Sequence, residues 1–159
     1  MKQSTNALDL LKVAEVELIY KGKGDYMRPV IQSADEAYAL LRNNWDENKL
    51  ELVEQFKVVL LDTNGECLGI AELAYGCISA CLVDVRLIFA TVLKSRAVSM
   101  ILAHNHPSGN LKPSNADIRL TKKIMEGGVL LDVTVADHLI VTRKGYYSFV
   151  NEKAMPAPF

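Results

Sequence analysis

Apolar and polar positions follow two different periods along the chain, and each period predicts a different kind of element. Alternation with a period of two predicts a strand over residues 14–20, and two runs rich in apolar residues predict the strands of a hairpin, over 56–61 and 67–73. The pair Asn64-Gly65 lies between the hairpin strands and favours a tight turn. Short apolar or alternating runs predict later strands over 98–103, 130–136, 138–142 and 146–150.

Apolar positions spaced three and four residues apart predict three helices, and each begins at a residue that can cap it. Ser33 opens a capping-box pattern at the start of a helix that reaches about residue 44. Asp84 precedes a helix over 85–96 whose apolar stripe is typical of core packing. Ser114 precedes the third helix, which the pair Gly127-Gly128 is expected to end.

This mixture of helices and strands predicts an α+β domain of the α/β/α type, built on a single mixed sheet. A chain of 159 residues, half of them hydrophobic, is long enough for one domain with its own core. The expected organisation is an N-terminal arm with one strand over residues 1–32, a main domain over 33–151 and a tail over 152–159.

Composition narrows the classes of protein to which the chain can belong. Its net charge is −1 and its isoelectric point is about 6.3, which argues against the strongly basic surface of a nucleic-acid-binding domain. Asp84 and Arg86 interrupt the longest apolar run, so no transmembrane helix is expected. Three cysteines without a zinc-ribbon pattern, together with no signal-peptide pattern, predict a cytoplasmic protein.

Two histidines stand at the end of the strand predicted over 98–103, in the string His104-Asn105-His106-Pro107. Residues i and i+2 of a strand point to the same face, so His104 and His106 are expected to direct both rings to one point. Pro107 offers no N–H group and ends the strand pairing. Two histidines at this spacing are a weak signal by themselves.

A carboxylate follows at Asp117, in the first turn of the helix that Ser114 caps. A Ser-x-x-Asp pattern begins many helices without any chemistry. Here, however, two imidazoles leave a strand, a loop rich in glycine and proline turns the chain, and the carboxylate opens the next helix. His104, His106 and Asp117 therefore predict a divalent metal site, with Zn²⁺ as the expected ion and one coordination position left open, as in catalytic zinc sites.

His138 follows Asp137, which raises the question of a fourth ligand or a catalytic pair. We interpret His138 as a partly buried histidine that makes an ordinary hydrogen bond. A fourth protein ligand would close the zinc coordination and remove the position that a catalytic site needs.

The order His-x-His-Pro followed by Ser-x-x-Asp resembles the JAMM (MPN-plus) metalloprotease motif, and residues 104–118 resemble the RadC-like JAB-domain family more closely. The resemblance continues over 137–141 and 145–149 and reaches back to 54–62. It implies a JAB/MPN-like architecture, similar to that of cytidine deaminases, in which helices flank one curved mixed sheet and the metal lies at its edge.

The resemblance also implies roles for individual residues. His104, His106 and Asp117 match the metal ligands of the family, and the implied cofactor is Zn²⁺. Ser114 matches a catalytic serine that hydrogen-bonds to the oxyanion.

An upstream glutamate completes the family motif as the general base that takes a proton from water. Glu54, just before the strand over 56–61, matches this position. Two rivals remain open. Glu66 is expected at the exposed tip of the hairpin, and Glu72 could reach the site only if the strand register differs from the one predicted.

The first functional expectation is a zinc-dependent metallopeptidase or isopeptidase-like hydrolase that acts on a peptide or protein substrate. The alternative is a protein associated with DNA repair, as the RadC label implies. The slight negative charge and the lack of a helix-hairpin-helix pattern before residue 50 favour an indirect link over duplex binding. A metal-dependent binding domain without peptidase activity is also open. Exposed sheet edges favour a homodimer, and no membrane partner is expected.

One segment departs from the family pattern. RadC-like chains carry a turn with Gly-Thr after the hairpin and a proline at the start of the next helix. This chain has residues 75–81 in place of that turn and Val85 in place of the proline. We expect recognition of the substrate to differ if this segment borders the cleft.

Overall fold

The computed structural model describes residues 27–77 and 83–159. Within them, three helices and five strands form a mixed sheet flanked by helices, which confirms the predicted α+β class. The strand predicted over 14–20 and Cys81 lie outside the described residues. The elements in chain order are α1 (Ala34–Asn43), β1 (Glu54–Leu61), β2 (Cys67–Cys77), α2 (Val85–Ser95), β3 (Ser99–Asn105), α3 (Asn115–Leu130), β4 (Thr134–Val141) and β5 (Tyr146–Ser148).

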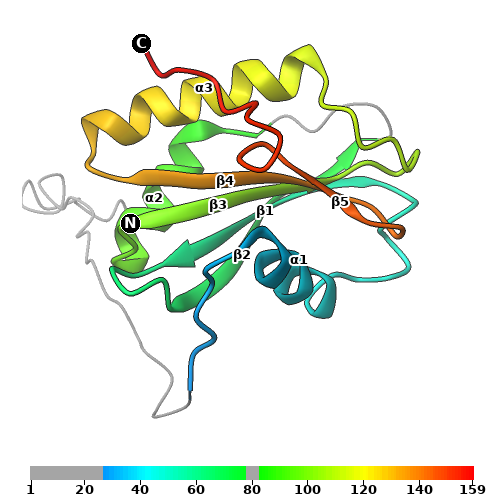
Figure 1. The fold of residues 1–159 in the computed structure, drawn as a ribbon, viewed down its shortest axis with the longest axis horizontal. Helices are drawn as coiled ribbons and strands as arrows, with labels where there is room; N and C mark the ends of the chain where they lie inside the picture. The colour runs from blue at the N-terminus through cyan, green and yellow to red at the C-terminus, as the bar shows by residue number, and fades with distance from the viewer. Residues whose placement is uncertain (1–26, 78–82) are drawn as a thin grey trace, which may run out of the picture.

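The strands lie in the order β2-β1-β3-β4-β5 (Figure 1). The pairs β1–β2, β1–β3 and β4–β5 are antiparallel, whereas β3 and β4 are parallel. Parallel neighbours need a crossover, and α3 supplies it. The loop into α3 therefore begins at the carboxyl end of β3, which brings the N-terminus of the helix back to the edge where the two histidines lie.

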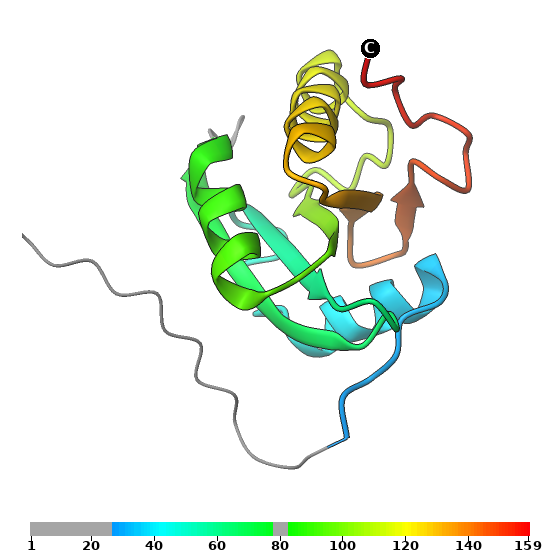
Figure 2. The same ribbon diagram turned by 90° about the vertical axis from the view of Figure 1, so that its left-hand side faces the viewer.

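Helices cover both faces of the sheet (Figures 1 and 2). One core lies between the sheet and α1 and contains Val59 and Leu61. The other lies between the sheet and the pair α2 and α3, and it contains Val58 and Leu60. Because both faces are buried, β1 reads as a nearly continuous apolar run rather than a clean alternation.

Helix α3 continues to Leu130, so the prediction that Gly127-Gly128 ends it is wrong. The two glycines are there for close packing. A Cβ at Gly127 would lie 2.6 Å from Cε2 of Phe89, and a Cβ at Gly128 would lie 2.3 Å from the carbonyl oxygen of Val133. The absence of side chains lets α2 and the start of β4 approach the helix.

The two strands predicted over 130–136 and 138–142 are one strand, β4, that begins only at Thr134. Its pairing with β3 shifts by one residue at Ala136, because Met100 pairs with Val135 and Ile101 pairs with Asp137. Such a bulge inverts the alternation of faces beyond it. As a result Val135 and His138 both face α3. The alternation of apolar and polar residues is interrupted at Ala136, although the strand itself continues, and this is why one strand was predicted as two.

The remaining boundaries differ from the predicted ones by a few residues. Strand β2 extends four residues further than expected, and β5 ends two residues earlier. Helix α2 ends at Ser95, and Arg96 follows in the left-handed conformation with φ 63°. In the parts of the chain that the structure describes, no helix has both the length and the apolar character to cross a bilayer.

Candidate metal centre

His104 and His106 direct their rings to one point at the carboxyl end of β3. His104 is the penultimate residue of the strand and is only 2% exposed. His106 follows the last strand residue, and its backbone N–H donates to the carbonyl of Val141 in β4 at 3.2 Å. This bond keeps the chain extended past the end of the strand, so the two Nε2 atoms lie 3.0 Å apart.

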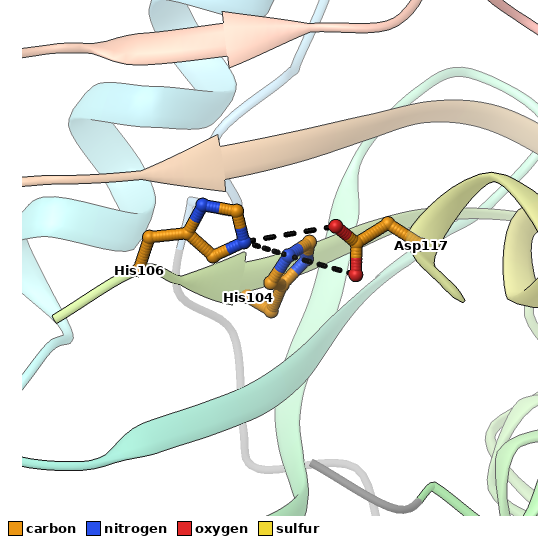
Figure 3. A group of neighbouring side chains, drawn as sticks. All are labelled: His104, His106 and Asp117. Carbon is orange, nitrogen blue, oxygen red and sulfur yellow. Dashed lines mark hydrogen bonds and ion pairs between the residues drawn. The ribbon is translucent and has the colours of Figure 1, made fainter. Parts of the chain in front are cut away.

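Asp117 is held against the two rings by the cap of α3 (Figure 3). The backbone N–H of Ser114 donates to Oδ2 of Asp117 at 2.7 Å, and the backbone N–H of Asp117 donates to Oγ of Ser114 at 3.2 Å. Oδ1 of Asp117 lies 3.4 Å from Nε2 of His104, and Oδ2 lies 3.7 Å from Nε2 of His106. The predicted capping box is confirmed, and it also orients the carboxylate.

The three side chains fit a metal ion. One ligand atom from each of His104, His106 and Asp117 lies within 4.8 Å of the others. Ligands that surround Zn²⁺ tetrahedrally at about 2.0–2.1 Å lie about 3.3 Å from one another. The two Nε2 atoms lie 3.0 Å apart, and the two oxygens of Asp117 lie 3.4 Å from His104 and 3.7 Å from His106, one oxygen facing each ring, all close to that value. The donor set of two imidazole nitrogens and a carboxylate oxygen also suits zinc.

Electrostatic interactions within this cluster are strong. Burial alone raises the pKa of Asp117, but the imidazoles of His104 and His106 outweigh it and hold that pKa well below its usual range. The carboxylate of Asp117 in turn raises the pKa of His106 above its ordinary value near 6.5, against the opposing effect of burial. The cluster therefore favours a positive charge between these groups, whether a proton or a metal ion supplies it.

The ring of His106 is oriented by its second nitrogen. Nδ1 lies 2.6 Å from the backbone carbonyl of Asn110, and a carbonyl can only accept a hydrogen bond. In a neutral ring the proton is therefore on Nδ1, which leaves a lone pair on Nε2 that faces Asp117 and His104. A ring nitrogen anchored in this way is typical of histidines that bind metals.

His138 is not placed to be a fourth ligand. It is fully buried, not partly buried as predicted, and its Nε2 lies 2.8 Å from Nδ1 of His104, on the far side of that ring from Asp117. The predicted hydrogen bond is present, but its partner is the candidate ligand itself. Burial lowers the pKa of His138 well below 6.5, so its ring is neutral. The neighbouring Asp137 accepts hydrogen bonds from the N–H groups of His138 and Val150, and its side chain points to the opposite face of β4 from His138.

Glu54 lies beside the cluster on the neighbouring strand. Phe56 pairs with His104, so the antiparallel register brings Glu54, two residues earlier, level with His106 and onto the same face. The negative charge of Glu54 contributes to the raised pKa of His106.

The two rival glutamates lie elsewhere. Glu72 accepts hydrogen bonds from Nζ of Lys57 and Nε2 of Gln55, at 2.7 and 2.9 Å. These two residues alternate with Phe56 along β1 and therefore point to the face that α1 covers. Glu66 follows the opposite end of β1, roughly 23 Å from Glu54 at about 3.3 Å per strand residue.

Asn105, between the two histidines, is a residue that the sequence analysis did not identify. Its side chain is fully buried on the face opposite to His104. Nδ2 donates to the carbonyls of Leu50 and Val53, at 2.7 and 2.9 Å, and Oδ1 accepts from the backbone N–H of Gln55 at 2.7 Å. A polar residue at the end of a buried apolar strand needs such partners, and this is the feature of the sequence that could have identified Asn105.

The sequence is similar to one family model and to several known proteins. A family model described as the RadC-like JAB domain matches residues 31–155. A UPF0758 protein of Flavobacterium johnsoniae is 48% identical over 99 residues, which are 62% of this chain and 43% of that protein. A UPF0758 protein of Alkaliphilus metalliredigens is 38% identical over 125 residues, which are 79% of this chain and 52% of that protein. The chain thus spans about half the length of the curated relatives it matches.

Proposed function

The chain belongs to the RadC-like JAB domain family, and from this membership and the cluster at the end of β3 we propose that it is a zinc-dependent hydrolase that cleaves amide bonds in a peptide or protein substrate. One observation carries the proposal. His104, His106 and Asp117 bring three ligand atoms within 4.8 Å of one another, and the two Nε2 atoms lie 3.0 Å apart, near the ligand spacing of a tetrahedral zinc site.

The three protein ligands leave one coordination position for water or substrate. A zinc ion bound there acts as a Lewis acid, which polarises a carbonyl oxygen and lowers the pKa of water. The side chains of His106 and Asp117 are 15% and 14% exposed, whereas that of His104 is 3% exposed. The centre is therefore open to the surface on the side of His106 and Asp117, where a substrate can approach.

Glu54 is the proposed general base. It removes a proton from the water that attacks the carbonyl carbon, and the proton then passes to the amine as the C–N bond breaks. The support for Glu54 is its position on the same sheet face as His104, next to His106. Glu72 lies on the other face, where Lys57 and Gln55 hold its carboxylate.

Ser114 is the proposed hydrogen-bond donor to the oxyanion. As the cap of α3 its Oγ accepts from the N–H of Asp117, so the cap uses a lone pair and leaves the hydroxyl proton free. The two roles are therefore compatible in one side chain. A donor aimed at the developing negative charge typically contributes about 10²–10³ in rate.

The test begins with the metal content of the purified protein, measured by mass spectrometry, and its activity on a library of peptide and isopeptide substrates. We expect one zinc per chain and a hydrolysis that a chelator abolishes and zinc restores. E54Q should keep the zinc and the fold and lose about 10²-fold or more of the activity. A protein that takes up no zinc when zinc is supplied contradicts the proposed centre, and full activity of E54Q contradicts the proposed base.

A further inference from the structure

We propose that Thr121 and His138 are positioning residues that fix the tautomer of His104, so that its Nε2 presents a lone pair to the metal. The inference rests on the proposed metal centre and extends it by two residues that do not touch the ion. They belong to α3 and β4, which are separate in the chain from the strand that carries His104. The hydrogens of these groups are fixed along one series of hydrogen bonds, which begins at the backbone carbonyl of Asp117.

The hydroxyl of Thr121 determines which group donates and which accepts in each of these hydrogen bonds. Its Oγ1 lies 2.6 Å from the backbone carbonyl oxygen of Asp117, one helical turn earlier. A carbonyl oxygen has no proton to give, so the hydroxyl must donate to it. Thr121 is fully buried, and its only proton is thereby committed.

His138 must then donate to Thr121 and accept from His104. Nδ1 of His138 lies 2.7 Å from Oγ1 of Thr121, which has only lone pairs left. The proton of the neutral His138 ring is therefore on Nδ1, and Nε2 is an acceptor. Nε2 of His138 lies 2.8 Å from Nδ1 of His104, so the proton of His104 is on Nδ1. What remains on Nε2 of His104 is a lone pair, directed at His106 and Asp117.

The surroundings of His138 hold its ring in this place. The ring stacks on Phe149 with centroids 4.9 Å apart and planes 11° apart, and the ring of Phe56 meets it edge-on with centroids 6.0 Å apart. These apolar walls favour a neutral ring. The bulge at Ala136 is what turns His138 toward α3, because regular alternation from Val135 would direct it to the opposite face.

The chain of bonds also ties two metal ligands together. Its first acceptor is the backbone carbonyl of Asp117, whose side chain is the third proposed ligand. The first turn of α3 therefore presents the carboxylate and, through Thr121 and His138, sets the protonation of the first histidine. Partners of this kind commonly change metal affinity by about 10–100-fold when they are removed.

The decisive comparison is T121V against T121S. Valine has nearly the shape of threonine but no hydroxyl, so His138 loses its acceptor and can turn its proton toward His104. Serine keeps the hydroxyl and serves as the rescue. We expect zinc affinity, measured by competition with a chromophoric chelator, to fall about 10–100-fold in T121V and to stay near the unsubstituted value in T121S.

A second measurement needs neither variant nor metal. Two-bond ¹H–¹⁵N NMR correlations of the metal-free protein report which nitrogen of His104 carries the proton. A proton on Nδ1 supports the relay, and a proton on Nε2 overturns it. Equal zinc affinity in T121V and T121S overturns it as well. Failure of the unsubstituted protein to bind zinc would instead refute the proposed centre, while the NMR result would still decide the tautomer.

Discussion

Oδ1 of Asn105 accepts a hydrogen bond of 2.7 Å from the backbone N–H of Gln55, the residue that follows Glu54. The residue between the two histidines thus fixes the strand that carries the proposed base. The two faces of β3 have different roles. His104 points to the proposed metal centre, and Asn105 points away from it and holds the neighbouring segment in register.

Replacement of Asn105 by alanine is expected to destabilise the fold. It removes three hydrogen bonds, two of them buried, and leaves the carbonyls of Leu50 and Val53 without this donor. At about 1 kcal/mol per bond, with a further penalty for buried groups left unpaired, N105A should lower the free energy of unfolding by about 2–4 kcal/mol. Urea denaturation measures this change. The exposed Asn151 provides the control, because N151A should change stability by less than about 0.5 kcal/mol.

A comparison of the two serine caps can distinguish an effect on stability from an effect on catalysis. Ser33 and Ser114 both form capping boxes, so S33A and S114A should each cost about 1 kcal/mol in thermal or urea unfolding. Only S114A should also lower the rate of hydrolysis, by about 10²–10³-fold, because only Ser114 lies at the proposed centre. Similar activity of the two variants would show that Ser114 is a cap and nothing more.

Gly128 is expected to be intolerant of any side chain. The Cβ of G128A would lie 2.3 Å from the backbone carbonyl oxygen of Val133, which cannot move without shifting the start of β4. Alanine favours a helix over glycine by about 1 kcal/mol, but the overlap should dominate and destabilise the protein by about 3 kcal/mol. Calorimetry on G128A and G69A tests this, because a Cβ at Gly69 meets nothing within 4 Å. Equal stability of the two variants would contradict the packing role of Gly128.

The affinity for zinc should fall as the pH is lowered. The pKa of His106 is raised by Asp117 in the metal-free protein, and a proton on that ring must leave before a metal can bind. The decline should therefore begin above pH 6.5, with the logarithm of the apparent affinity changing by about one per pH unit for each proton displaced. Chelator competition between pH 5.5 and pH 8 measures the slope. A constant affinity down to pH 6 would be inconsistent with this pair.

His106 and Asp117 also determine how the folding stability of the metal-free protein depends on pH. The lowered pKa of Asp117 contributes stability above the ordinary aspartate value, and this is lost as the pH falls through the lowered pKa. The raised pKa of His106 contributes stability below 6.5, and this is lost as the pH rises through the raised pKa. Both contributions are present between about pH 4 and pH 6.5. In chemical denaturation of the metal-free protein, D117N should therefore be most destabilising within that window.

Local features of the chain were predictable from the sequence. The hairpin, the caps at Ser33 and Ser114, and the convergence of His104, His106 and Asp117 depend on residues close together in the chain. Periods of two and of about 3.6 residues, together with known cap preferences, are sufficient to identify such features.

Features that depend on distant neighbours could not be predicted in this way. The glycines of α3 are required by Phe89 and Val133, and nothing in their own sequence surroundings distinguishes them from a helix end. The bulge at Ala136 shifts the phase of β4, so one strand reads as two. Thr121 appears as an ordinary polar position of a helix until His138 is brought against it.

All three proposed ligands come from residues 104–117, a single strand, loop and helix, whereas Glu54 comes from a different part of the chain. Closing a short loop costs little entropy, so the three ligand side chains belong to one compact supersecondary unit. Catalysis also needs Glu54, which is placed beside the ligands only when β1 pairs with β3 in the observed register. Metal binding and catalysis can therefore be lost separately during evolution. A related protein that loses the glutamate would keep the three metal ligands.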